Sequence, residues 1–374
     1  MKEEILGACY VLEENKLRDN LKVISQVASK AQVEIIVALK ASAMWSIFPI
    51  MREYLDSATA SSLAEARLVK EEFGSLSHTY APTYQEHEFD EILSCSSHIT
   101  FNSLSQFARF SPRARAAGVS CGLRINPLFS PVETDLYNPC VPNSRLGVEP
   151  RFLSEIPEGM DGLHCHNLCE SSAQDAKKTL EQIEKYFSHI LPKIKWLNLG
   201  GGHLMTRKGY DTELLITSLR EFNAKYPNLK IILEPGSAHT WQTGYLEASI
   251  EDIIPTGETM TAMLNVSFAC HMPDCLEMPY KPQIRGAHEP QQGETRWRMG
   301  GCSCLAGDFC GDWSFENEPK VGDKIIFEDM IHYTMVKTTM FNGVAHPSIA
   351  IKDTKGEIKI VKKFDYEDFK GRMS

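Results

Sequence analysis

Lys40 ends an apolar run, residues 33–39, that is typical of a buried β-strand. A strand buried on both faces lacks alternation and is rich in β-branched residues, as this run is. A charged lysine at a dry strand end is costly to desolvate, so its amine acquires a lowered pKa and becomes a nucleophile for carbonyl groups. The alternative is a side chain that extends past the strand into water. The features that follow along the chain favour the nucleophile.

Two further features stand directly after apolar runs. Gly200, Gly201 and Gly202 follow residues 194–199, and Glu234 follows residues 230–233, with Gly236 two positions on. A glycine triplet lets backbone N–H groups approach a phosphate, although a tight turn would use the same residues. A carboxylate at a strand end can hold a proton on a ring nitrogen, and its alternative is a helix cap or a surface charge.

His164 and His166 end another apolar run, residues 162–166. We expect the two side chains to point to opposite sides of the strand. Only one of them would then face the active site, where a flat imidazole can stack on a ring, and the other would be a packing histidine. A His-x-His pair on a strand can also ligate zinc, which is the chemistry of metal-dependent barrel hydrolases.

Eight short apolar runs recur over the first two-thirds of the chain, and helical patterns separate most of them. Alternating strands and helices predict a parallel sheet, and eight units in about 240 residues fit a (β/α)₈ TIM barrel. Active sites of such barrels lie at the C-terminal ends of the strands, where all four features above are found. The runs are residues 33–39, 56–60, 77–81, 98–101, 121–126, 162–166, 194–199 and 230–233.

After about residue 241 the pattern changes to strands separated by turns, with no helical segment between them. The pattern predicts strands of an all-β domain at residues 246–250, 263–268, 324–328 and 349–352. We therefore predict a cofactor-binding barrel at 11–240 and a β-domain at 241–374, joined by an N-terminal strand at 1–10. Residues 127–150, rich in proline, are predicted to form a long loop.

Composition limits the classes of function. The chain has 374 residues with 43% hydrophobic and 24% charged content, as soluble globular proteins do. Its net charge of −10 argues against a nucleic-acid partner and suits a cationic small substrate. The start of the chain does not resemble a signal peptide, and no apolar run is long enough to span a membrane. Eleven scattered cysteines are then expected to be reduced thiols in the cytoplasm.

A nucleophilic lysine, a phosphate loop, a carboxylate and a flat histidine at one end of a barrel together describe a pyridoxal 5′-phosphate site. The chain resembles the fold-type III pyridoxal phosphate decarboxylases, which include the ornithine and diaminopimelate decarboxylases. Within that family it is similar to the carboxynorspermidine and carboxyspermidine branch. The stretches that carry the resemblance are residues 37–41, 163–170, 197–203, 234–236, 270–274 and 301–308.

The resemblance implies the fold, a barrel followed by a β-domain, and a homodimer with two shared active sites. It implies that Lys40 forms the Schiff base, that His166 stacks on the ring, and that Glu234 pairs with the ring nitrogen. Cys304 would protonate the substrate carbon from the neighbouring subunit. The implied phosphate contacts are Gly200, Gly201, Gly202, Gly236 and Tyr333, and the implied contacts with the distal end of the substrate are Asp274 and Asp308.

This chain departs from the family pattern at two places. Asn167 and Leu168 follow His166 where relatives have Gly-Ser, and Ser237 stands where relatives have arginine. The lost positive charge disfavours a diaminopimelate-like carboxylate, and the carboxynorspermidine branch shares both departures. The reaction expected is therefore decarboxylation of carboxynorspermidine or carboxyspermidine, with diaminopimelate, ornithine or arginine as alternatives.

Three other interpretations of the same residues are less favoured. Glu234 argues against a racemase of this fold, which would place arginine at the ring nitrogen. The presence of both Lys40 and Cys304 argues against a relative that has lost catalysis. A zinc-binding β-domain is disfavoured by ligand spacing, so we expect no metal; its candidate ligands are Cys270, His271, Cys275, Cys302, Cys304 and Cys310.

Overall fold

A computed structural model describes residues 7–278 and 280–374 of the chain. The chain divides into two compact units. The barrel unit is residues 19–239, and the β-unit combines the segment up to residue 18 with residues 240–374. The domain limits drawn from the sequence stay a prediction, and residues 1–6 of the expected N-terminal strand lie outside the described residues.

The barrel unit is a closed parallel sheet, as the sequence predicts. The strand order is β2-β10-β9-β8-β7-β6-β5-β4-β3. Each of the eight predicted segments overlaps an observed strand, and the first is divided in two. The strands are β2 (Glu34–Ile35), β3 (Val37–Ala38), β4 (Ala58–Ala60), β5 (Ser77–Tyr80), β6 (Ser96–Phe101), β7 (Ser120–Arg124), β8 (Gly162–His164), β9 (Trp196–Asn198) and β10 (Lys230–Leu233).

The divided first strand closes the barrel. β2 pairs with β10 and β3 pairs with β4, so one extended segment bonds to the last strand on one side and to the second on the other. Ile36 lies between β2 and β3, and its N–H donates to the carbonyl of Leu233 at the end of β10, at 2.9 Å. This bond continues the pairing with β10 up to the start of β3. Lys40 follows this seam directly.

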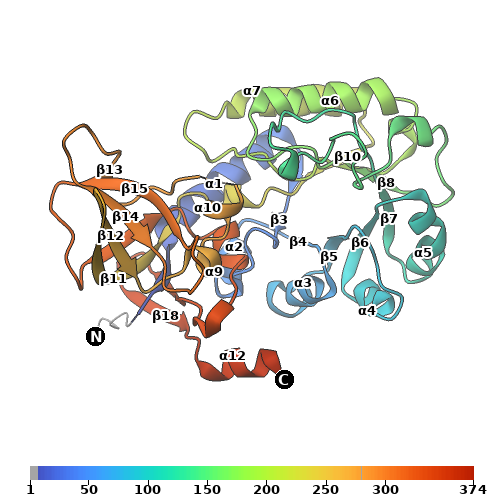
Figure 1. The fold of residues 1–374 in the computed structure, drawn as a ribbon. Helices are drawn as coiled ribbons and strands as arrows, with labels where there is room; N and C mark the ends of the chain where they lie inside the picture. Colours follow the sequence, from blue (N-terminus) through green and yellow to red (C-terminus); the bar gives the residue numbers. More distant parts are fainter. Residues whose placement is uncertain (1–6, 279) are drawn as a thin grey trace. The chain divides into compact units, whose positions relative to one another are not determined.

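Helices connect the barrel strands, and side chains cap the first turns of several of them. Ser172 and Asp175 form a reciprocal capping box at α6, and Ser62 accepts from the N–H of Glu65 at α3. α6 and α7 lie side by side in Figure 1, joined by the Lys225–Glu184 ion pair at 2.9 Å. The helices are α1 (Glu14–Ala31), α2 (Phe48–Met51), α3 (Leu63–Leu68, continued by a π-helical turn, Val69–Phe73), α4 (Phe89–Ser94), α5 (Leu104–Ala116), α6 (Ala173–Phe187), α7 (Thr212–Lys225) and α8 (Ser237–Thr240).

The β-unit is built on one mixed sheet with the order β13-β15-β14-β12-β11-β1-β17-β18, to which β16 adds by pairing with β11. β1 pairs with β11 and β17, and Cys9 and Val11 pack on Tyr245 and Ala350 in a buried cluster. The strands are β1 (Cys9–Glu13), β11 (Gly244–Thr256), β12 (Thr259–Leu264), β13 (Ala287–His288), β14 (Arg296–Gly300), β15 (Phe309–Phe315), β16 (Lys324–Glu328), β17 (Ser348–Lys352) and β18 (Ile358–Lys362); the helices are α9 (Phe268–His271), α10 (Asp274–Glu277), α11 (Tyr333–Val336) and α12 (Tyr366–Met373).

Candidate active site

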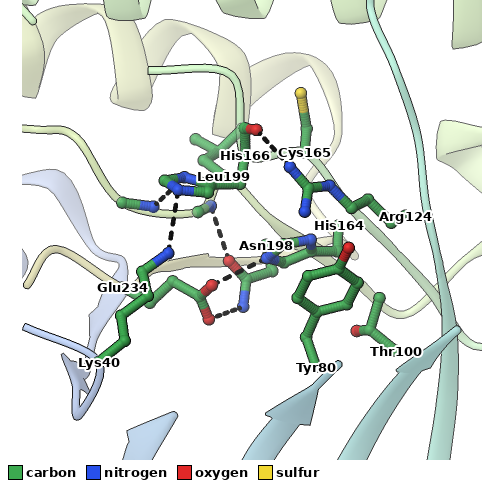
Figure 2. Close-up of polar contacts among 12 residues, drawn as sticks. Lys40, Tyr80, Thr100, Arg124, His164, Cys165, His166, Asn198, Leu199 and Glu234 are labelled. Carbon is green, nitrogen blue, oxygen red and sulfur yellow. Dashed lines mark hydrogen bonds and ion pairs between the residues drawn. The ribbon is translucent and has the colours of Figure 1, made fainter. Parts of the chain in front are cut away.

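Lys40 points its amine at His166. The Nζ atom of Lys40 lies 3.1 Å from Nε2 of His166. Figure 2 draws this contact as a dashed line between the two side chains. Burial lowers the pKa of Lys40, and the nearby Arg124 guanidinium lowers it further, against the opposing effect of Glu234. A lysine amine with a lowered pKa has a larger uncharged, nucleophilic fraction at neutral pH.

The hydrogen bonds of His166 give independent support for an uncharged Lys40 amine. Nδ1 of His166 accepts from the N–H of Gly201 at 2.9 Å. Burial holds the pKa of His166 well below its usual value, so the ring is neutral, and its single proton is on Nε2 because Nδ1 is the acceptor. Nε2–H can then only donate towards Lys40, and an acceptor amine is an uncharged one.

Glu234 is a buried carboxylate clamped at both oxygens. Oε1 lies 2.8 Å from Nε2 of His164, and Oε2 accepts from Nδ2 of Asn198 at 2.9 Å (Figure 2). Burial alone would raise the pKa of Glu234, but its contact with His164 and its hydrogen bond from Asn198 lower it to about 2. The carboxylate therefore stays ionised at neutral pH.

The prediction that His164 and His166 point to opposite sides of their strand was wrong. Their ring centroids are 6.4 Å apart, and each ring contacts a polar group of the barrel unit, Glu234 for His164 and Lys40 for His166. Residues i and i+2 of a strand share a face, because the side-chain period is two. His164 is thus part of the polar cluster and not a packing histidine on the other side.

The glycine loop after β9 depends on the absence of side chains. Gly200 and Gly202 have φ of +66° and +87°, and a Cβ on Gly200 would lie 2.5 Å from Cβ of His166. The N–H of Gly200 donates to Oδ1 of Asn198 at 2.8 Å, and that of Gly201 donates to His166. A phosphate bound by those two amides would have to replace these acceptors. Gly236 packs against Ala41, where an added Cβ would lie 2.4 Å away.

Three side chains of this cluster were missed by sequence reasoning and a fourth, His164, was given only as a possible packing residue, but all four share one signal. Each is the last residue of its strand: Tyr80 of β5, Arg124 of β7, His164 of β8 and Asn198 of β9. Polar residues at the C-terminal ends of barrel strands are the expected active-site positions. Arg124 donates to the carbonyl of His166 at 2.9 Å and lies 4.8 Å from the centre of the Tyr80 ring.

The remaining predicted residues belong to the β-unit. Cys304 is exposed on the loop after β14, and its N–H donates to Oδ1 of Asn342 at 2.8 Å. Asp308 is buried and accepts from the N–H groups of Ala269 and Ser303, each at 3.0 Å. The predicted substrate ligand Asp308 thus holds the loop that carries Cys304.

Asp274, the other predicted substrate ligand, begins α10 and forms an ion pair with Lys337. Lys337 also pairs with Glu277, so this acidic pair shares one cation. Tyr333 begins α11 and makes an edge contact with the ring of His332. In the part of the chain that the structure describes, no group of three or more His, Cys, Asp or Glu residues is arranged to hold a metal ion.

The barrel cluster fits pyridoxal phosphate. Lys40 would supply a buried amine with a lowered pKa for the aldehyde, and Glu234 would supply a negative charge for a protonated ring nitrogen. Comparison with known proteins agrees. Residues 9–331 match the family model described as pyridoxal-dependent decarboxylase, C-terminal sheet domain. The chain belongs to this family of pyridoxal-dependent decarboxylases. Pyridoxal phosphate is its cofactor.

Full-length relatives of this decarboxylase carry names that specify substrates. It is 53% identical to carboxyaminopropylagmatine decarboxylase of Synechocystis, over 98% of this chain and 95% of the relative. It is 40% identical to carboxynorspermidine/carboxyspermidine decarboxylase of Campylobacter jejuni, over 98% of each chain. The crystal structure of carboxynorspermidine decarboxylase from Campylobacter jejuni in complex with norspermidine matches with a TM-score of 0.91 at 38% identity, over 98% of this chain and 100% of that one.

All eleven cysteines are free thiols in this structure. In the described residues, no helix combines the length and apolarity that crossing a membrane requires.

Proposed function

We propose that this decarboxylase removes CO₂ from a carboxylated polyamine, with carboxynorspermidine and carboxyspermidine as substrates and norspermidine and spermidine as products. The full-length relatives of that name and the matching structure with norspermidine support this substrate class. The observation that carries the chemistry is the placement, within one barrel, of a buried lysine amine 3.1 Å from His166 and a buried carboxylate held at both oxygens by His164 and Asn198.

Bound pyridoxal phosphate would supply an aldehyde for the amine and a ring that accepts the electron pair left by CO₂. Lys40 would hold the aldehyde until the substrate amine takes its place. Glu234 would keep a proton on the ring nitrogen and so stabilise the negative charge that develops as CO₂ leaves. His166 would cover the ring, Gly200 to Gly202 and Gly236 would hold the phosphate, and Cys304 would deliver a proton to the substrate carbon.

Carboxyaminopropylagmatine is a second candidate substrate. The relative named for it is more similar to this chain, at 53% identity, than the carboxynorspermidine decarboxylase at 40%. The candidates share the carboxylated end and differ at the distal end, which is an ammonium in one case and a guanidinium in the other. An acidic pair such as Asp274 and Glu277 could receive either cation, and a guanidinium can bind a carboxylate through two parallel hydrogen bonds.

We further propose that the protein acts in the cytoplasm as a homodimer with shared active sites, to which Cys304 and Tyr333 contribute from the partner. Leu305, Phe309 and Phe341, all on or next to the Cys304 loop, are between 43% and 49% exposed. Apolar side chains gathered on a surface are typical of interaction sites.

The deciding measurement is CO₂ release by the purified, cofactor-loaded protein. The substrates to compare are carboxynorspermidine, carboxyspermidine, carboxyaminopropylagmatine, meso-diaminopimelate and ornithine. The proposal predicts turnover of the carboxylated polyamines only. The ratio of kcat/KM between the guanidino compound and the two triamines then identifies the preferred distal group. Turnover of diaminopimelate or ornithine at comparable rates would refute the substrate class while retaining the cofactor chemistry.

A further inference from the structure

His164 occupies a position from which it can control Glu234. It is the last residue of β8, its side chain is 1% exposed, and its Nε2 lies 2.8 Å from Oε1 of Glu234. Asn198 holds the other oxygen of the carboxylate (Figure 2). Two donors on two different strands thus fix the plane of this carboxylate. They restrict the rotation that the flexible glutamate side chain would otherwise have.

The His164 ring is itself held in place. The Tyr80 ring stacks on it with centroids 5.1 Å apart and planes 22° apart. Tyr80 is anchored in turn, because its hydroxyl donates to Oδ1 of Asn102 at 3.0 Å. A side chain whose rotamer is set by packing and by a further hydrogen bond is the support that a precise site requires.

The protonation of the pair follows from its surroundings. Burial lowers the pKa of His164, against the opposing effect of Glu234, while the pKa of Glu234 is lowered to about 2. The stable form is therefore a neutral imidazole that donates Nε2–H to an ionised carboxylate. Nδ1 is then an acceptor, and this buried atom has no hydrogen-bond partner among the residues that the structure describes.

A small cavity inside the barrel lies beside His164. The cavity has a volume of about 10 Å³ and is lined by His164, Glu234 and polar side chains that include Thr59 and Thr100. This is room for one water molecule among polar partners. A water there that contacts Nδ1 would donate to it and so keep the proton of His164 on Nε2.

We propose that His164 is a positioning residue for the ring-nitrogen site: it holds Glu234 in one orientation through a neutral Nε2–H donor. A cationic lysine or arginine at this position would orient the carboxylate but would also cancel its charge. A neutral histidine leaves the full negative charge for a protonated ring nitrogen. The inference rests on the proposed function, in which Glu234 faces that nitrogen.

Three substitutions of His164 separate this role from packing. Glutamine places its Nε2 as many bonds from Cα as histidine does, asparagine is one bond too short, and leucine has no donor. His164→Leu and His164→Asn should each weaken binding of pyridoxal phosphate to the cofactor-free protein, and lower kcat, by about ten to a hundredfold. His164→Gln should restore both quantities towards those of the wild-type protein. His98→Leu is the matched control, because His98 lines the same cavity and hydrogen-bonds with Ser97 rather than with Glu234.

Equal loss in the glutamine, asparagine and leucine variants, or no loss in any of them, would overturn the proposal. If His164→Leu does not fold, the comparison of glutamine with asparagine decides. A second readout needs no substitution: ¹⁵N NMR of histidine-labelled, cofactor-free protein should find His164 neutral with its proton on Nε2. A proton on Nδ1, or a cationic ring at pH 7, would contradict the proposal.

Glu234→Gln distinguishes the failure of this inference from the failure of the proposed function. If Glu234→Gln changes neither cofactor affinity nor kcat, the assigned role of Glu234 is wrong and His164 has nothing to position. If Glu234→Gln impairs both while His164→Leu impairs neither, only the role of His164 fails.

Discussion

The two groups of proposed catalytic residues are held in opposite ways. In the barrel unit, Lys40, His166 and Glu234 are fixed by side-chain hydrogen bonds to one another and to strand-end residues. In the β-unit, Cys304 is exposed, and backbone N–H groups that donate to Asp308 and Asn342 hold its loop. The barrel sets the protonation of its residues by burial, whereas the loop sets only the position of its residue.

Because of this difference, we expect mutations in the barrel and mutations on the Cys304 loop to have different effects. Changing a barrel residue alters both the geometry and the charge state of its neighbours, because the groups are buried and share hydrogen bonds. Changing a loop residue should alter the position of one thiol and leave the cofactor chemistry in place. The predictions below test that separation, beginning with the largest effect.

Lys40→Ala should abolish turnover, a loss of about four orders of magnitude or more, because it removes the covalent attachment of the cofactor. Absorbance of the dialysed protein should show no covalently held cofactor. Lys40→Arg, which keeps a cation but cannot bond to the aldehyde, is the control and should be equally inactive. Retention of turnover in either variant would exclude Lys40 from the role assigned here.

Cys304→Ala should slow decarboxylation by about a hundredfold or more, the usual contribution of a positioned acid, while cofactor affinity stays that of the wild type. Cys302→Ala, two residues away on the same exposed loop, should leave both quantities unchanged. Steady-state rates and cofactor titration measure the two effects. A Cys304 variant that no longer binds cofactor would show that the two units are not separable in this way.

Asp308→Asn should lower kcat by about tenfold to a hundredfold with little change in KM, because displacement of the Cys304 loop misplaces its thiol. The sequence assigned Asp308 to substrate binding instead, which predicts a raised KM at unchanged kcat. Asp274→Asn serves as the comparison and should raise KM through loss of a charge-assisted contact. A rise in KM for Asp308→Asn would favour the assignment made from the sequence.

The smallest effects concern stability. Gly122→Ala should destabilise the barrel by about 1–3 kcal/mol, since rigid neighbours have to move when a core is overpacked. An added Cβ would lie 2.1 Å from the ring of Trp196. Gly307→Ala, on the Cys304 loop, would meet nothing within 4 Å. Its urea midpoint should therefore match the wild type, and equal shifts in both variants would contradict this contrast.

Much of the barrel could be read from the sequence because its strands are continuous apolar runs. The eight runs and the residues that follow four of them predicted both the fold and the positions of Lys40 and Glu234. The division of the first strand into β2 and β3 was not visible, since it arises from pairing with two different neighbours. Such pairing is a long-range property that the local pattern does not contain.

The misses have identifiable physical causes. β14 and β15 were overlooked because charged residues such as Arg298 and Asp312 interrupt their apolar pattern, and these two form an ion pair across the strands at 2.8 Å. The role of His164 was missed through an error in strand periodicity. The hydrogen bond from Ala269 to Asp308 joins segments 39 residues apart, so spacing alone could not reveal it.

The seam between β2 and β10 has a kinetic consequence. It pairs Glu34 with Ile232, so nearly two hundred residues must be ordered before Lys40 and Glu234 can belong to one site. Contacts of such long sequence separation carry a large loop-closure entropy and form slowly. A chain emerging from the ribosome therefore has no cofactor site until the last barrel strand has been made. Recovery of pyridoxal phosphate binding during refolding should thus report barrel closure rather than the earlier formation of helices.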